Sequence, residues 1–275
     1  MAPAALRYAA DDHILARQGP FEVRLAASEA EVRAAQQLRH EVFRTEAQLP
    51  PLASGIEADR FDPFCDHIIV CDRSAKTPEG RPPVVGTYRA LRSEAAVSGF
   101  YSDAEFDLAQ LFGRHPHLRF CEVGRSCVAQ PYRALGVLDA LWRGLFVYAA
   151  RHGIDVYFGV ASFPGTDPRA HAMALSWLCH HEVGGPAWHA EARSGGAVPM
   201  DLVAPQALDR RLAMRQMPAL VRGYLQIGAH IGRTAFVDPV FGTIDVLVVA
   251  PLADAPRPWR RRFEPRPGPA LTSRV

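Results

Sequence analysis

The residues with the clearest potential for chemistry lie in one stretch, Glu122 to Leu138, which reads EVGRSCVAQPYRALGVL. A predicted strand ends here in a short turn that contains Arg133 and Gly136, and a predicted helix follows at once. Backbone N–H groups point outward from the first turn of a helix, and the helix dipole favours an anion or a polarised carbonyl. The pattern therefore predicts a cofactor-binding turn at Arg133 and Gly136, with an ordinary strand-to-helix connection as the alternative.

Histidines and cysteines give no comparable signal. His171, His180 and His181 have no carboxylate at a matching metal-ligand spacing. The five cysteines are odd in number and form no CxxC pair, a pattern typical of reduced thiols rather than of disulfides or a zinc site. We therefore predict no metal site.

The elements that precede this stretch are predicted from the pattern of their own residues. Residues 21–26 alternate as a strand, and Ser28 with Glu31 forms a capping-box start for a helix that reaches about residue 43. Residues 45–65 are rich in Pro, Gly and Asp, which predicts a long loop of the kind that is often functional.

The remaining pattern alternates strands and helices. A central strand at 118–128, a helix at 138–152 stopped by Gly153 and a strand at 155–161 form a compact unit. The other predicted elements are a hairpin of strands at 67–72 and 83–91, a helical region around 106–111, helices near 168–182 and 206–228, and a last strand at 243–250. We predict one mixed α/β domain over residues 21–252, a flexible N-terminal arm at 1–20 and a basic, proline- and arginine-rich tail at 253–275.

Composition limits the possible partners and location. Lysine and arginine total 31 against 29 acidic residues, and Lys76 is the only lysine. The isoelectric point of about 8.3 lies below the value of about 9 that is typical of nucleic-acid-binding domains, so no nucleic-acid partner is expected. Neither a secretory signal nor an apolar spanning segment is present, which predicts a cytoplasmic protein. The arginine-rich tail allows peripheral contact with inner-membrane lipid or with an acidic carrier protein, or is simply a free tail.

The turn at residues 133–138, Arg-Ala-Leu-Gly-Val-Leu, resembles the cofactor loop of the GNAT superfamily, (Arg/Gln)-x-x-Gly-x-(Gly/Ala). The resemblance implies an α/β (α+β) GNAT-like acyltransferase fold, in which helices flank a mixed central sheet. Leu138 departs from the pattern, because a small residue there lets a pyrophosphate approach closely. A pantetheine arm carried by acyl carrier protein tolerates that change better than coenzyme A does.

Four short motifs, LRHEVF (38–43), EADRFD (57–62), GTYR (86–89) and EVGR (122–125), are similar in type, order and spacing to those of acyl-homoserine-lactone synthases and N-acyl amino acid synthases. The tryptophan that lactone synthases carry after the phenylalanine is absent, which counts against a lactone product. The residues that fall on motif positions are Arg39, Phe43, Asp59, Asp62, Arg89, Glu122 and Arg125.

Longer motifs extend over about residues 21–252 and resemble the ornithine N-acyltransferases of ornithine-lipid biosynthesis; they are EVGRSCVAQPYR, YFGVASFPGTDP and residues 218–249. The resemblance implies transfer of a 3-hydroxyacyl chain from acyl carrier protein to the α-amine of L-ornithine, giving a lyso-ornithine lipid. No cofactor would be bound permanently, because the phosphopantetheine thioester of acyl carrier protein is the donor. Acyl carrier protein and L-ornithine are the implied partners.

This reaction suggests roles for the residues around the central strand. Only a neutral amine attacks, so Glu122 is predicted to be the general base, with an ion pair to Arg125 or Arg89 as the alternative. Backbone N–H groups around Ser126, Cys127 and Val128 are predicted to stabilise the oxyanion, at the bulge where this strand splays in GNAT folds. A covalent intermediate on Cys127 is the alternative route, although a strand cysteine is more often a small buried hydrophobe.

The amino acid's own charges need partners as well. Asp59 and Asp62 are predicted to bind the cationic end and Arg89 the carboxylate, while Arg39, Phe43 and Arg125 complete the substrate-binding set. Turn formation by the aspartates, a solvated strand position for Arg89, and a helix-surface or loop-anchoring role for Arg39 are the alternatives.

Two other functions compete with this one. Another N-acyl amino acid synthase, including an acyl-homoserine-lactone synthase, would use the same motifs. A membrane-active, hemolysin-like protein is the non-enzyme alternative, but no long amphipathic or spanning segment favours pore formation.

Overall fold

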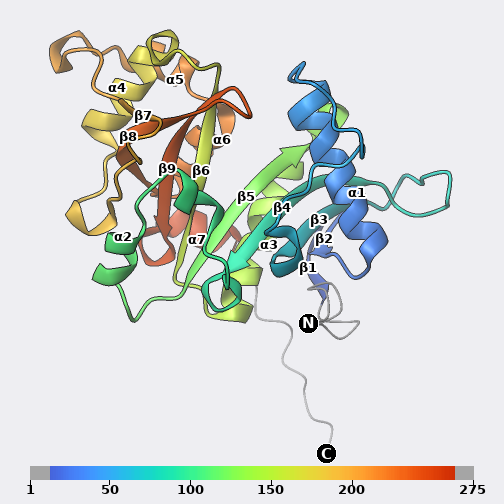
Figure 1. Ribbon diagram of the computed structural model, residues 1–275. Helices are drawn as coiled ribbons and strands as arrows, with labels where there is room; N and C mark the ends of the chain where they lie inside the picture. Colours follow the sequence, from blue (N-terminus) through green and yellow to red (C-terminus); the bar gives the residue numbers. More distant parts are fainter. Residues whose placement is uncertain (1–12, 264–275) are drawn as a thin grey trace, which may run out of the picture.

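The computed structural model describes residues 13–263, whose strands form one mixed sheet with helices on both faces (Figure 1). The strands are β1 (Ile14–Gln18), β2 (Phe21–Leu25), β3 (Asp66–Asp72), β4 (Val84–Arg92), β5 (Phe120–Val128), β6 (Val156–Pro164), β7 (Ala197–Pro199), β8 (His230–Asp238) and β9 (Thr243–Pro251). The helices are α1 (Glu29–His40), α2 (Ala109–Arg114), α3 (Val137–His152), α4 (Ala172–His181), α5 (Arg210–Gln216), α6 (Ala219–Gln226) and α7 (Arg257–Phe263). This architecture confirms the predicted GNAT-like α/β fold.

The sheet runs in the order β1-β2-β3-β4-β5-β6-β9-β8-β7, and its one parallel pair, β5 with β6, lies in the middle. These two strands pair only from Phe120 to Glu122 on β5 and then diverge, as Figure 1 shows. Gly159 lies at the point of divergence, where a Cβ atom would come within 2.3 Å of the Val123 carbonyl oxygen. A glycine is therefore required there, and the divergence opens a gap in the centre of the sheet.

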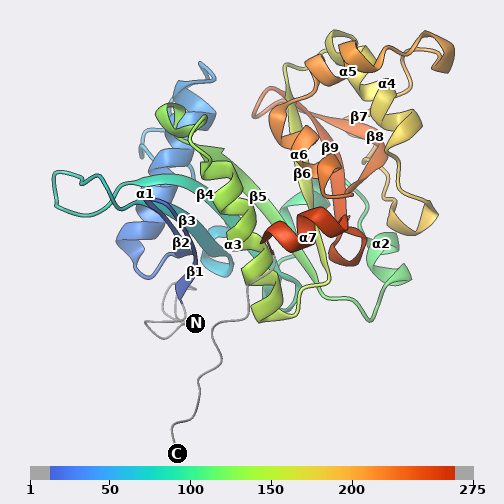
Figure 2. The ribbon, with the colours of Figure 1, turned by 180° about the vertical axis from the view of Figure 1, so that it is seen from behind.

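Alternate side chains of β3 pack against the helices on its two faces. Ile68 and Val70 belong to the large core under α3, whereas Ile69 and Cys71 pack with Ala35 of α1. Figure 2 shows α3 lying across the first strands of the sheet, with α7 beside it. The period of two along β3 thus fixes α1 and α3 on opposite faces.

The structure confirms the two helix ends that were predicted from capping residues, at Ser28 and at Gly153. The Ser28 side chain accepts from Glu31 N at the start of α1, and Glu31 in turn accepts from Ala27 N. Gly153 ends α3 in a left-handed conformation, with φ of 61°. A π-helical turn (Glu41–Thr45) extends α1 to the predicted end of that helix.

Several boundaries differ from the prediction. Residues 14–18 were expected in the flexible arm but form β1, a five-residue strand that pairs with β2. Strand β8 was not predicted at all. The helix expected over 206–228 is split into α5 and α6 at Pro218, which cannot donate a helical hydrogen bond.

The tail prediction also needs a partial correction. Residues 257–263 form α7, and Trp259 packs edge-on against Trp142 of α3 at 6.0 Å between ring centroids. The domain therefore reaches past residue 252. The rest of the predicted tail (264–275) and the first part of the predicted arm (1–12) lie outside the described residues.

Within residues 13–263, no helix has both the length and the apolar character needed to cross a bilayer.

Candidate active site

A β-bulge distorts the central strand just beyond the point where β5 and β6 separate. Thr87 of β4 pairs with Cys127, but Arg89 pairs with Gly124, so Arg125 and Ser126 together oppose a single residue, Tyr88. Arg125 takes a left-handed conformation, with φ of 52°, to accommodate the extra residue. The bulge that the GNAT resemblance implied near Ser126 is therefore present.

A cavity of about 310 Å³ lies between the diverging strands. Its walls come from β4, β5, β6, β9 and α6, from the last residue of β8 and the loop after it, from the π-helical turn after α1 and from the loop before α2. The polar and charged side chains on these walls are Arg89, Tyr101, Ser102, Glu122, Arg125, Ser126, Ser162, Tyr224, Asp238, Thr243 and Asp245.

A second, more open hollow adjoins the cavity and shares Ser126 with it. Cys127, Val128 and Arg133 line this hollow. Arg133 Nε donates to the Val128 carbonyl at 3.1 Å, and its guanidinium also pairs with Glu46. Of the predicted cofactor-binding turn, Arg133 therefore lines the second hollow, whereas Gly136 begins α3 with φ of 81° and is not part of the lining.

Glu122 lies on the cavity wall and is almost fully buried. Its carboxylate accepts from Tyr101 N at 2.8 Å and from Ser102 N at 2.7 Å, and it also accepts from the Ser102 hydroxyl. Burial raises the pKa of Glu122, although these three hydrogen bonds oppose that shift. No arginine of the described chain lies within ion-pair distance of the Glu122 carboxylate. The alternative, a direct ion pair of Glu122 with Arg89 or Arg125, is therefore not observed.

The predicted arginines are held in a buried network with acidic loop residues. Arg39 is fully buried, donates to the Glu57 carbonyl at 2.6 and 3.0 Å, and pairs with Asp62. It does not line the cavity, so it has the loop-anchoring role that was the alternative to direct substrate binding. Arg89 does line the cavity and pairs with Asp59 at 2.6 Å and Asp62 at 2.8 Å.

Asp59 and Asp62 are therefore matched by cations of this chain. Asp59 also forms an ion pair with Arg125, with 3.1 Å between Arg125 Nη2 and Asp59 Oδ2. Neither aspartate lines the cavity. Burial alone would raise the pKa of Asp62, but Arg39 and Arg89 hold it well below its ordinary range. The geometry gives no support to the prediction that these aspartates contact a substrate ammonium; they position the arginines instead.

Arg125 and Phe43 belong to an aromatic cluster at the cavity wall. The Arg125 guanidinium lies 4.4 Å from the ring centre of Tyr101 and 4.9 Å from that of Phe241. Phe43 meets Phe241 edge-on at 6.4 Å. Arg125 remains a cation, since Glu57 and Asp59 offset the effect of burial and raise its pKa.

Cys127 is poorly suited to a covalent mechanism. The thiol is buried and lines the second hollow but not the cavity that contains Glu122. Burial raises its pKa to about 12, so the nucleophilic thiolate is scarce at neutral pH.

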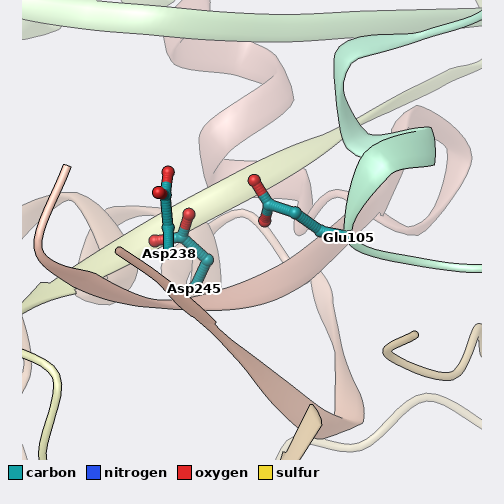
Figure 3. A group of neighbouring side chains, drawn as sticks. All are labelled: Glu105, Asp238 and Asp245. Atoms are coloured by element: carbon teal, nitrogen blue, oxygen red, sulfur yellow. The ribbon is translucent and has the colours of Figure 1, made fainter. Parts of the chain in front are cut away.

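Three buried carboxylates that were not predicted from the sequence, those of Glu105, Asp238 and Asp245, lie together (Figure 3). Glu105 precedes α2, whereas Asp238 ends β8 and Asp245 lies in β9. The available signal was the segment DPVFGTID, in which two aspartates flank a tight turn between strands. Burial, together with Asp245 and Asp238, raises the pKa of Glu105 to about 9, and burial also raises that of Asp245.

Glu105→Gln is expected to stabilise the protein increasingly as the pH rises. Between pH 4.5 and 9 the folded protein retains a proton on Glu105 that the unfolded chain has lost, so wild-type stability falls across this range. Glu105→Gln has no carboxyl group to titrate and so does not lose this stability. Relative to wild type, we expect its unfolding free energy to be higher by about 1–3 kcal/mol at pH 9 and nearly equal at pH 5. Urea unfolding at pH 5, 7 and 9 measures this difference, with Glu41→Gln, at an exposed position, as the control. An equal change at every pH would contradict the prediction.

The chain is similar to several known proteins and to one family model. A family model described as an acetyltransferase (GNAT) domain matches residues 38–143. A solved structure of FeeM, an N-acyl amino acid synthase from uncultured soil microbes, aligns with a TM-score of 0.49 and 11% identity, over 89% of this chain and 95% of that one.

Two curated relatives share most of their length with this protein. The L-ornithine N(alpha)-acyltransferase of Agrobacterium fabrum is 44% identical over 249 residues, which cover 88% of this chain and 85% of that protein. The protein of the same name from Brucella abortus is 43% identical over 248 residues, covering 88% of each chain. Because this identity covers 88% of the chain and most of each relative, the chain is an acyltransferase and belongs to the L-ornithine N(alpha)-acyltransferase family.

Proposed function

We propose that this enzyme transfers a 3-hydroxyacyl chain from the phosphopantetheine thioester of acyl carrier protein to the α-amine of L-ornithine. The observation that carries the proposal is the cavity between β5 and β6, in which a buried carboxylate, Glu122, lies close to the strand bulge. The names of the relatives supply the acceptor. The product is a lyso-ornithine lipid.

The donor arm occupies the second hollow in this proposal. Arg133 lines that hollow and presents a cation to the carrier's phosphate, and the first turn of α3, which follows Arg133 in the chain, supplies backbone N–H groups. The half-buried Leu138 side chain packs against the core. The thioester then lies where the two hollows meet, beside Ser126.

The chemistry is a direct displacement. The neutral α-amine attacks the thioester carbonyl carbon, a C–N bond forms, and the C–S bond breaks as the pantetheine thiolate leaves. Glu122 accepts the proton that the amine loses, directly or through water, and its raised pKa suits a base at neutral pH. Backbone N–H groups at the bulge, around Ser126 to Val128, stabilise the developing oxyanion.

Arg89 and Arg125 are the cations that bind the carboxylate of the amino acid. Both line the cavity, and both have a raised pKa despite their burial, because acidic neighbours compensate their charge. Guanidinium groups bind carboxylates through paired hydrogen bonds, which fixes the orientation of the α-amine.

Expression in a bacterium that makes no ornithine lipid tests this function. The expected result is a new lipid whose mass and fragments correspond to a 3-hydroxyacyl group in amide linkage to the α-nitrogen of ornithine. Cells that express Glu122→Gln at equal level serve as the control and are expected to lack it. An acylated lactone, or the same amide of another amino acid, would overturn the proposed acceptor.

A further inference from the structure

We propose that Glu105, Asp238 and Asp245 bind the side-chain ammonium of the acceptor and so select a diamino acid. This inference rests on the proposed function and names the part of the site that distinguishes L-ornithine from neutral amino acids of similar length. The three carboxylates are separate from Glu122, the proposed base.

The three side chains converge from different parts of the chain. One oxygen from each lies within 4.8 Å of the others, and the residues are only 3–6% exposed. Figure 3 shows the Glu105 carboxylate directed from the loop before α2 toward Asp245 on β9. Three acidic groups this close and this buried repel one another, and a bound cation relieves that repulsion.

Two of the oxygens, Glu105 Oε2 and Asp245 Oδ1, are completely buried and accept from no N–H or hydroxyl group of the described chain. Without a bound cation, Glu105 and Asp245 instead hydrogen-bond to each other, which requires a proton on one of the two carboxyl groups. Asp238 differs, because its Oδ1 accepts from Val240 N at 2.6 Å and Phe241 N at 3.2 Å in the turn after β8. Buried oxygens without donors are costly, and an ammonium supplies three N–H donors together with a positive charge.

The group also borders the reaction cavity. Asp238 and Asp245 line the same cavity as Glu122, together with Ser162 and Thr243. Ornithine carries amines at both ends of a short aliphatic chain, so one cavity must receive both. With the α-amine beside Glu122, Asp238 and Asp245 are the carboxylates that remain available on the cavity wall, and Glu105 contributes an oxygen within 4.8 Å of theirs.

Two other acidic residues near the site, Asp59 and Asp62, do not line the cavity and so do not reach a bound ammonium. Asp59 and Asp62 face Arg39, Arg89 and Arg125, which compensate their charge. In contrast, Glu105, Asp238 and Asp245 form no ion pair with an arginine or histidine in the described residues within 4.0 Å.

Acceptor preference in Asp245→Asn tests the inference. Wild type and variant are assayed with L-ornithine and with L-norvaline, which has the same carbon chain without the second amine. We expect wild type to prefer ornithine by at least about 100-fold in kcat/KM, and the variant to lose about 10- to 100-fold of that preference through a higher KM for ornithine. The rate with norvaline stays within about 3-fold. Asp201→Asn, at an exposed pair with His180, is the matched control and keeps the preference.

Binding is measured separately by thermal shift, so the result does not depend on turnover. Ornithine is expected to stabilise wild type more than norvaline does, and Asp245→Asn is expected to lose that difference. An unchanged preference in the variant, or an equal loss with both acceptors, would overturn the inference while leaving N-acylation intact. Stabilisation by Mg²⁺ or Ca²⁺ with loss of activity in a chelator would assign the group to a metal instead. If wild type acylates no amino acid yet binds ornithine in preference to norvaline, the proposed function fails and the ammonium site stands.

Discussion

Glu122→Gln is expected to lower kcat/KM for amide formation by about 100- to 10,000-fold, the range typical of a lost general base. The glutamine has nearly the same shape and retains an oxygen that accepts from Tyr101 N or Ser102 N. It cannot take a proton from the amine. Steady-state assays at saturating donor measure the loss, and circular dichroism verifies that the variant is folded.

Ser102→Ala separates a catalytic role of Glu122 from a structural one. The Ser102 hydroxyl donates to the carboxylate and lowers its pKa, so its removal raises that pKa. We expect this variant to stay within about 10-fold of wild type, with the rising limb of its pH profile shifted to higher pH. Equal losses in the two variants without a shifted pH profile would show that Glu122 only anchors the turn at Tyr101 and Ser102.

Asp62→Asn is expected to destabilise the fold by about 3–5 kcal/mol, because it leaves two buried cations without their shared counter-charge. Arg39 is fully buried and Arg89 nearly so, and both pair with this carboxylate. Urea unfolding at neutral pH measures the change. Asp201→Asn, which removes a surface charge paired with His180, is expected to cost less than about 1 kcal/mol.

The pH dependence gives this prediction a definite sign. The folded-state pKa of Asp62 lies well below its unfolded value, so its contribution is complete above about pH 4 and is lost as the pH falls toward the folded pKa. The difference in unfolding free energy between wild type and Asp62→Asn should therefore be constant from pH 5 to 8 and become smaller in strong acid. A difference that grows in acid would mean that Asp62 is not the stabilising anion.

The local sequence was sufficient to predict the elements that carry the site. Ser28 with Glu31, and Gly153, marked helix ends because capping depends on neighbouring residues alone. The strand, helix and strand at 118–161 were predicted as one compact unit, and in the structure its two strands, β5 and β6, pair in parallel. Strand β1 escaped detection because five residues hold too little periodicity to separate a strand from a loose arm.

The roles of the acidic residues could not be predicted in the same way. Asp59 looked available for a substrate cation because the sequence does not show that Arg89 and Arg125 face it across the fold. Glu105 and Asp245 looked unrelated, since the loop before α2 meets β9 only once the sheet has formed. Whether a charge is free or compensated is a tertiary property, and it decides which carboxylates can bind substrate.

The central claim is that this chain forms an amide on the α-nitrogen of ornithine. Its most direct test is incubation of the purified protein with a 3-hydroxyacyl carrier protein and L-ornithine, followed by tandem mass spectrometry of the product. The expected product is the Nα-acyl ornithine, released together with one free carrier thiol per amide and absent with Glu122→Gln. If the folded wild type forms no amide with ornithine or with any other amino acid, from either the carrier protein or the coenzyme A thioester, the claim is wrong.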